Sequence, residues 1–266
     1  MDVFAIGLSM GESPRWRDGR LWVCDWMAGE VLSFDASGER RVELEVTGFP
    51  FSVDWLPDGR TLLTSPTGVV MADGSPYGAS GQACNEIVVD ARGNVFVNAA
   101  GFDLMGGETP KPGFVWVVCP DGSSRQVAEG VMFPNGMAVT PDGETLIVAE
   151  SYANRLTAFD IAPDGGLSGR RVWAEVAFAP DGICLDSEGA VWYATVPGKC
   201  CERVAEGGAV LERVIADRGC FACMLGGDDG RTLYVVATEW GGVGSVGGRS
   251  GRLLTHPAPA PHAGRP

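Results

Sequence analysis

Short hydrophobic runs separated by glycine and proline alternate along the whole chain. The runs are four to seven residues long and rich in Val, Leu, Ile, Phe and Trp, while glycine (39) and proline (17) recur between them. Long stretches with the helical spacing of apolar residues are absent from the sequence. Short strands at even spacing are typical of an all-β architecture, so we expect strands throughout.

A polar turn followed by a hydrophobic strand recurs six times. The first copy is Asp18-Gly19 followed by residues 21–24, and the fourth is Asp142-Gly143 followed by residues 145–148. The intervals between successive turn glycines run from 34 to 50 residues. Glycine permits the positive φ that such hairpin turns require. The six turn glycines are Gly19, Gly59, Gly93, Gly143, Gly189 and Gly230.

A period near forty residues, with several strands in each unit, is typical of a β-propeller. One four-stranded sheet cannot bury both of its faces, whereas six sheets stacked around an axis can, and they leave only short edges. We therefore predict an all-β, six-bladed β-propeller with four-stranded blades and a central metal site. Residues 1–255 are expected to form this single domain, and residues 256–266 to form a flexible C-terminal tail.

The residues just before the innermost strand of each blade converge on the axis of a propeller. Counting back seven or eight residues from each turn glycine gives Glu12, Ser52 (or Phe51), Asn85, Asn135, Asp181 and Ala222. Four of these six positions carry a carboxylate or amide oxygen, the ligand type that hard divalent cations prefer. Carboxylates that converge in a partly buried channel repel each other, and a cation between them removes that cost.

This shared register predicts one divalent cation on the axis. Taken singly, Asn135-Gly136 and Asp181-Gly182 are also typical of tight turns, and only their common register with Glu12 favours a metal site. Oxygen ligands suit Ca²⁺, Mg²⁺ or Mn²⁺, and an open site with few protein ligands also accepts Zn²⁺ or Fe²⁺. The identity of the cation therefore stays open.

The charge of the chain limits its partners. The formal net charge is -14 and the pI is near 4.5, which argues against nucleic-acid or anionic-membrane partners. The N-terminus shows no secretory signal and no apolar run reaches the length of a membrane span. We expect a cytoplasmic protein, a monomer or weak oligomer, whose eight cysteines are reduced thiols.

Histidine is almost missing from the sequence. The two histidines, His256 and His262, both lie in the expected tail. A Ser-His-Asp or Cys-His hydrolase needs an internal imidazole to take the proton of the nucleophile, and a three-histidine zinc site needs one more. The sequence therefore argues against both classes.

The segments around the axial positions resemble the senescence-marker-protein/gluconolactonase/luciferin-regenerating-enzyme family, the regucalcin-like propellers. The resemblance extends over residues 8–240, and its motifs are specific as an ordered set rather than singly. It rests on the segments GESPRW (11–16), NEIVVD (85–90), PNGMA (134–138), PDGICLD (180–186) and GG (226–227) followed by LYV (233–235).

This resemblance implies a six-bladed propeller that binds one divalent cation and opens lactones with water. Glu12, Asn135 and Asp181 match the metal ligands of the family. Asn85 matches its substrate-contacting asparagine close to the metal, and Asp181 matches the residue proposed as general base. The implied partner is a small-molecule substrate, a lactone.

One position departs from the family. Sugar-lactone members carry an arginine two residues before the substrate-contacting asparagine, where this chain has Ala83, beside Gln82. Four phenylalanines also stand just before axial positions, and the loop 99–113 adds Phe102 and Met105 near the same mouth of the channel. We expect Gln82, Phe51, Phe102 and Phe133 to contact the substrate in a less polar pocket, although the phenylalanines are equally expected to pack between blades. The four phenylalanines are Phe51, Phe133, Phe178 and Phe221.

The leading hypothesis from the sequence is a metal-dependent lactone hydrolase in which Asp181 takes the proton of the attacking water. A second hypothesis keeps the site but changes the reaction, to phosphotriester hydrolysis or to a lyase or isomerase reaction on a less polar substrate. A third is a propeller that binds a ligand without catalysis and holds a purely structural ion.

Overall fold

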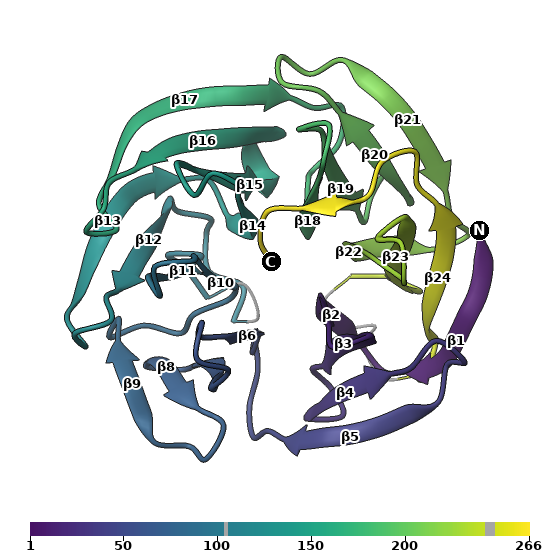
Figure 1. Ribbon diagram of the computed structural model, residues 1–266, viewed down its shortest axis with the longest axis horizontal. Coiled ribbons are helices and arrows are strands. Elements are labelled where there is room, and N and C mark those ends of the chain that lie inside the picture. The colour runs from purple at the N-terminus through teal and green to yellow at the C-terminus, as the bar shows by residue number, and fades with distance from the viewer. Residues whose placement is uncertain (104–105, 243–247) are drawn as a thin grey trace.

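Six antiparallel sheets stand in a ring around a central axis in the computed structural model, which describes residues 1–103, 106–242 and 248–266 (Figure 1). Within these residues five sheets have four strands and one has five. The predicted six-bladed propeller with four-stranded blades is therefore confirmed. The additional strand comes from the C-terminal segment.

Each blade runs from an inner strand near the axis to an outer strand at the rim (Figure 1). Blade one contains β2 (Gly11–Arg17), β3 (Arg20–Asp25), β4 (Glu30–Phe34) and β5 (Arg40–Glu45). Blade two contains β6 (Val53–Trp55), β7 (Thr61–Ser65), β8 (Gly68–Met71) and β9 (Pro76–Ala79). Blade three contains β10 (Ile87–Val89), β11 (Val95–Ala99), β12 (Gly113–Val118) and β13 (Ser124–Val131).

The remaining blades follow the same order. Blade four contains β14 (Pro134–Val139), β15 (Thr145–Glu150), the 3₁₀ helix η1 (Ser151–Ala153), β16 (Arg155–Ile161) and β17 (Leu167–Glu175). Blade five contains β18 (Ile183–Asp186), β19 (Val191–Thr195), β20 (Cys200–Val204) and β21 (Val210–Ile215). Blade six contains β22 (Gly219–Gly226), β23 (Thr232–Thr238), β24 (Gly251–Pro257) and β1 (Asp2–Leu8).

The six turn glycines connect the inner strand of each blade to the second strand. All six have positive φ, between +71° and +90°. In blade four, for example, the Gly143 amide donates to the Thr140 carbonyl at 2.8 Å. Glycine therefore recurs at these positions because the turns require a positive φ, at which a residue with a side chain would be strained.

The ring is closed by the N-terminal strand. β1 pairs antiparallel with β24 and forms the outer edge of blade six, whose other strands come from the C-terminal part of the chain. This pairing joins the N-terminal strand to a strand from the C-terminal part of the chain, so that blade six is completed by both ends of the ring (Figure 1).

Residues 256–266, expected to be a flexible tail, pair with the sheets of the propeller. The segment contains β25 (His262–Ala263), which pairs with Leu185 and Asp186 of β18. Beyond it, Arg265 and Val139 exchange two backbone hydrogen bonds at 2.7 and 2.9 Å. The free inner edge of blade five offers unpaired backbone groups to any nearby strand, and the segment follows that edge to the centre of the ring (Figure 1). Backbone hydrogen bonds therefore hold this segment against blades four and five, and it does not extend from the propeller as a free tail.

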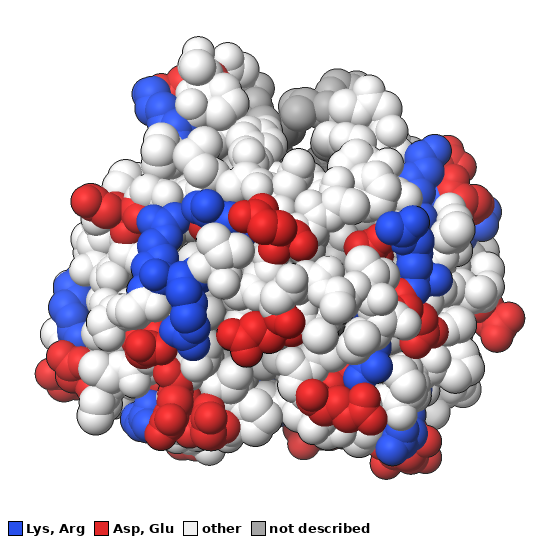
Figure 2. Space-filling model, turned by 90° about the horizontal axis from the view of Figure 1, so that it is seen from above, with Lys and Arg blue, Asp and Glu red and all other residues white. Residues whose placement is uncertain are grey.

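The core fills the spaces between neighbouring blades. One cluster joins Val88 and Phe96 of blade three to Met137 and Leu146 of blade four, all at most 1% exposed. The eight cysteines are buried free thiols. On the outer wall seen in Figure 2, acidic and basic side chains are interspersed. Among the described residues there is no helix with the length and hydrophobicity needed to cross a bilayer.

Candidate functional site at the channel axis

The oxygen-bearing residues predicted from the repeat lie at the beginning of four inner strands. Glu12 and Asn135 are the second residues of β2 and β14, and Asp181 and Asn85 lie two residues before β18 and β10. Asn85 Nδ2 lies 3.5 Å from Asn135 Oδ1. The structure thus brings Asn85, Asn135, Asp181 and Glu12 to the same end of the channel, through the contacts described below.

Bulges turn two of these side chains toward the axis. The pairing of β2 with β3 shifts between Glu12 and Arg15, where Ser13 has a φ of +48°. The pairing of β14 with β15 shifts between Pro134 and Met137, on either side of Asn135. A bulge interrupts the alternation of side chains along a strand and changes the direction of one of them. A regular strand would not allow this change of direction.

The glycines after Asn135 and Asp181 serve close packing rather than turns. Neither Gly136 nor Gly182 has a positive φ. A Cβ atom on Gly136 would lie 2.7 Å from the Asp181 carbonyl oxygen, and one on Gly182 would lie 2.5 Å from the Ala222 Cβ. Inner strands of blades four, five and six therefore approach each other only because these residues are glycines. The tight-turn explanation for the two motifs is not supported.

Glu12 is buried, Asp181 is partly buried, and their carboxyl groups act on each other. Burial, followed by the negative charges of Asp181 and Glu86, raises the pKa of Glu12 well above its usual value. Burial and the charge of Glu86 likewise raise the pKa of Asp181, while a hydrogen bond from Asn135 acts in the opposite direction. Asp181 Oδ1 is buried without a hydrogen-bond partner. Such an oxygen is costly unless a proton or a cation meets it.

A third carboxylate, Glu86, is neutralised by protein groups. Arg15 Nη2 lies 3.0 Å from Glu86 Oε1, and both side chains are less than 10% exposed. Ser13 Oγ lies 2.7 Å from the same oxygen, and Ser52 Oγ donates to it as well. Glu86 therefore has a fixed counterion, Arg15, whereas Glu12 and Asp181 form no ion pair with another described residue.

The charges of this cluster fit a divalent cation. The cluster has three carboxyl groups and one guanidinium, so that with all of them ionised it has two negative charges in excess, the charge that one divalent ion would neutralise. The partnerless Asp181 Oδ1 and the Asn135 amide oxygen add hard oxygen donors. Among the described residues no group of three or more His, Cys, Asp or Glu side chains is arranged to hold a metal ion. The two carboxylates and the asparagine that the sequence predicted as ligands therefore stay a prediction.

Neighbouring polar side chains hold the two asparagines in place. Asn98 Nδ2 donates to the Asn135 carbonyl at 2.6 Å, and the Asn98 carbonyl accepts from the Asn85 amide at 2.8 Å. Ser151 Oγ donates to the Pro180 carbonyl at 2.7 Å and lies 3.4 Å from Asn135 Nδ2. Asn98 is fully buried, so its hydrogen bonds are a fixed part of this end of the channel.

The predicted substrate-contacting residues divide into three groups. Phe51 is 1% exposed and packs in a core cluster with Val53 and Trp55, a placement that does not support contact with a substrate. Phe102 and Phe133 are partly exposed and contact each other. Gln82 is half-buried. Met105 lies outside the described residues.

Ala83, the position that departs from the family, is exposed. Its methyl group leaves room at this position of the chain, between Gln82 and the buried Cys84. Phe178 is partly exposed, and Phe221 is 4% exposed with its ring edge-on to Trp240 at a centroid distance of 5.5 Å. Phe51 and Phe221 are therefore buried, whereas Phe102, Phe133 and Phe178 keep exposed surface, and contact of these three with a substrate stays a prediction.

Sequence reasoning missed the residues that support the axial cluster. Arg15, Glu86 and Asn98 were not assigned a role, yet they form the buried ion pair and the asparagine support. The only signal for them was a charged or amide side chain inside an apolar strand pattern, such as Asn98 in the run 95–99. Polar residues at such positions are rarely buried without partners.

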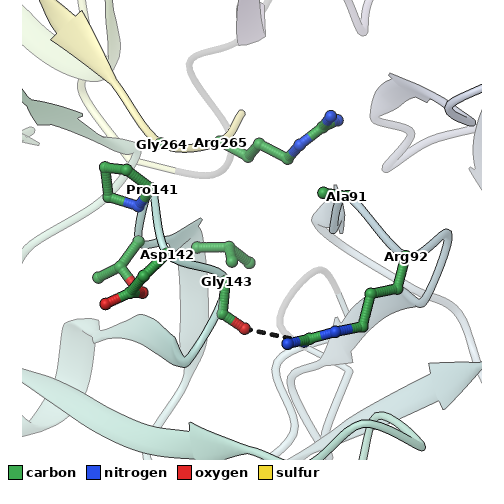
Figure 3. Close-up of a pocket in the computed structure, with 9 residues that line it drawn as sticks. Ala91, Arg92, Pro141, Asp142, Gly143, Gly264 and Arg265 are labelled. Atoms are coloured by element: carbon green, nitrogen blue, oxygen red, sulfur yellow. Dashed lines mark hydrogen bonds between the residues drawn. The ribbon is translucent and has the colours of Figure 1, made fainter.

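A cavity of about 260 Å³ lies at the opposite end of the inner strands. It is lined by residues 139–143 of blade four, by Ala91 and Arg92 of blade three, and by Gly264 and Arg265. Figure 3 shows the Arg92 side chain reaching across to the Gly143 carbonyl, a hydrogen bond of 3.0 Å. Because β14 begins beside Asn135 and ends at Val139, this cavity contains none of the axial oxygen donors.

Known proteins that are similar to this chain include two lactonases and a gluconolactonase of known structure. The pentonolactonase XacC of Haloferax volcanii is 29% identical, over 90% of this chain and 84% of its own. The lactonase drp35 of Staphylococcus saprophyticus is 27% identical, over 67% of this chain and 60% of its own. The structure of XC5397 from Xanthomonas campestris, a gluconolactonase, superposes with a TM-score of 0.78 at 22% identity, over 97% of this chain and 89% of that one.

The family resemblance noted in the sequence is also tested by a sequence profile. The profile described as the SMP-30/Gluconolactonase/LRE-like region matches residues 10–239. The match begins before Glu12 and ends in blade six, and so covers all four oxygen-bearing axial positions. The chain therefore belongs to the SMP-30/gluconolactonase/LRE-like family.

Proposed function

We propose that this protein is a hydrolase that opens a lactone ring with water and depends on a divalent cation at the channel axis. The observation that carries the proposal is the Asp181 Oδ1 atom, which is buried without a hydrogen-bond partner and whose carboxyl group lies close enough to the buried Glu12 to raise its pKa. The names of two curated relatives, a pentonolactonase and a lactonase, support lactones as the substrate class.

The proposed ligands are Glu12, Asn135 and Asp181. When bound, the cation would supply Lewis-acid polarisation of the ester carbonyl and would balance the two excess negative charges of the cluster. Ca²⁺, Mg²⁺, Mn²⁺, Zn²⁺ and Fe²⁺ are all compatible with these donors. The buried pair of Arg15 and Glu86 fixes the charge beside them, so that Glu86 does not compete for the ion.

Asp181 is the proposed general base. In this proposal the Asp181 carboxylate accepts the proton of the attacking water while it remains beside the cation. The water oxygen then forms a bond to the lactone carbonyl carbon, the ring C–O bond breaks, and the ring oxygen takes up a proton. The product is an open-chain hydroxy acid.

Asn85 is the proposed electrophilic partner in this reaction. Its amide is partly exposed and close to Asn135, so it is free to donate to the carbonyl oxygen, on which negative charge develops. Asn98 keeps both asparagines in register, because it bonds to the backbone of each. An open arrangement of this kind favours catalysis over a purely structural ion, since Asn85, Asn135 and Asp181 all retain exposed surface.

The experiment that tests the proposal is a lactone panel on protein stripped of metal. Each of the five cations is added back, and opening of glucono-δ-lactone and of δ-valerolactone is followed by acid release. We expect activity with at least one cation and none without. The variant Glu12→Gln should lose cation binding, whereas Glu144→Gln, which is exposed at the far end of blade four, should not.

Two outcomes would contradict the proposal. A protein that opens no lactone with any cation is not a lactonase, and the same panel with a phosphotriester then tests the second hypothesis from the sequence. A protein that opens lactones equally well after chelation, with no metal by elemental analysis, is not metal-dependent.

A further inference from the structure

Three aromatic side chains form a continuous apolar surface beside the axial site. We call Phe102, Phe133 and Tyr152 the aromatic triad. The rings of Phe133 and Tyr152 are stacked at a centroid distance of 4.6 Å, and Phe102 lies 5.6 Å from the first and 6.0 Å from the second. All three are at least partly exposed, and Tyr152 keeps 46% of its surface. Each ring thus contacts both others.

The triad is tied to the candidate site through the backbone. Phe133 lies two residues before Asn135, and its carbonyl accepts from the Ser151 amide at 3.1 Å. Tyr152 follows Ser151, whose hydroxyl lies 3.4 Å from Asn135 Nδ2. Phe133 is therefore close to Asn135 along the chain, and Tyr152 is next to Ser151, which contacts Asn135. Both rings lie at the same end of the channel as Asn135.

The backbone of Phe133 is held in an unusual conformation. Its φ is +55°, in the left-handed region that bulky residues rarely adopt. Packing in a core does not require this conformation, and such outliers cluster at functional sites. An exposed apolar surface next to convergent polar groups is also typical of a ligand-binding site.

We propose that the triad binds an apolar ring substituent of the substrate, so that the lactones opened here carry an aromatic or alkyl group rather than hydroxyl groups. This inference rests on the proposed lactonase function. The triad has flat apolar faces and, apart from the Tyr152 hydroxyl, no hydrogen-bonding group. A sugar lactone would leave its hydroxyls unpaired against it, whereas a phenyl group stacks on it.

The experiment compares three lactones with the same six-membered ring: δ-phenyl-δ-valerolactone, δ-valerolactone and glucono-δ-lactone. The ratio of kcat/KM for the phenyl lactone to that for the unsubstituted lactone measures recognition of the substituent, and comparing variants cancels the intrinsic reactivity of each substrate. We expect Phe102→Ala and Tyr152→Ala each to lower this ratio by about 3- to 10-fold. Tyr152→Phe keeps the ring and should keep the ratio.

Trp240→Ala is the matched control. Trp240 is also a partly exposed aromatic residue, 36% exposed, but it pairs with Phe221 in blade six and is not part of the triad. We expect its removal to leave the ratio unchanged. Metal content and the thermal transition of every variant show whether it is folded and loaded.

The outcomes separate this inference from the function on which it rests. If the protein opens lactones but prefers glucono-δ-lactone to the phenyl lactone, or if the triad variants leave the ratio flat, the inference is overturned and the lactonase proposal stands. If Trp240→Ala lowers the ratio and the triad variants do not, the substituent lies elsewhere and the inference is equally overturned. If no lactone is opened with any cation, both proposals fail.

Discussion

The two ends of the inner strands are built from the same repeat but have different chemistry. At the far end of blade four, Asp142 accepts from Thr140 Oγ1 at 2.6 Å, and Arg92 donates to the Gly143 carbonyl at 3.0 Å (Figure 3). At the near end, Asp181 Oδ1 has no partner, and Glu12 and Asp181 raise the cost of each other's charge. The far-end groups Asp142 and Arg92 thus have hydrogen-bond partners, whereas one carboxylate oxygen at the near end, Asp181 Oδ1, has none.

This difference separates the residues that build the fold from the residues that remain available for binding or catalysis. The far-end turns are alike in all six blades, because each needs a glycine with positive φ. The near-end positions differ, with a carboxylate or amide side chain in four blades, Ser52 in blade two and Ala222 in blade six. Unsatisfied buried carboxylates destabilise a fold, and they persist where a bound group compensates them.

The largest expected effect compares one aspartate at each end. Asp181→Asn removes the proposed base and one ligand charge, and we expect kcat/KM to fall by about 10²- to 10⁴-fold. Asp142→Asn makes the same chemical change at the far end and should leave kcat/KM within about twofold. Lactone hydrolysis at saturating cation measures both. Equal losses in the two variants would mean that the near end is not the active site.

Deletion of residues 258–266 tests the far end instead. The deletion removes the two bonds between Arg265 and Val139, and one bond each from Ala258 to the Arg231 carbonyl, from Ser187 to the Pro261 carbonyl and from His262 to the Gly230 carbonyl. At about 1 kcal/mol for each bond, we expect a loss of about 5 kcal/mol in the free energy of unfolding, measured by urea denaturation. The kcat of the folded protein should remain unchanged. A stable variant that has lost activity would contradict the separation of the two ends.

Chelation should destabilise the near end in a way that depends on pH. Burial raises the pKa values of Glu12 and Asp181 in the cation-free fold, so the folded state holds protons that the unfolded state releases above about pH 4. Stability is therefore full at low pH and is lost as pH rises through the raised values. We expect chelated protein to melt earlier at pH 8 than at pH 5.

Cation-loaded protein is the control for this experiment. A cation at a hundred times its dissociation constant contributes about 2.7 kcal/mol to the free energy of unfolding, and it should flatten the dependence on pH. A chelated protein whose melting temperature rises between pH 5 and pH 8 would show that the two carboxyl groups are not buried against each other.

The two ends also differ in how much of them the sequence predicts. The six turn glycines follow from local rules, and from them the axial positions follow by counting. The position of the Glu86 side chain could not be predicted in this way. Glu86 precedes β10, which begins at Ile87, so the alternation of side chains along the strand does not say which face of the sheet Glu86 lies on. The C-terminal pairing was missed because β25 has two residues, in a segment rich in proline and glycine, and its partner β18 is distant in sequence.

The smallest expected effect concerns Ala83, the exposed position two residues before Asn85. Ala83→Arg places a guanidinium with fixed donors at the near end, where it can bond the hydroxyls of a sugar lactone. We expect the ratio of kcat/KM for glucono-δ-lactone to that for δ-valerolactone to rise by about 5- to 10-fold, the effect of one hydrogen bond. Ala83→Met adds similar length without donors and should leave the ratio unchanged. The far end offers the matching test, because Ala91→Arg adds the same charge beside the cavity of Figure 3 and should not change the ratio either. If Ala83→Arg leaves the ratio flat while its metal content is intact, Ala83 does not face the substrate, and the polarity of the pocket is set by other residues.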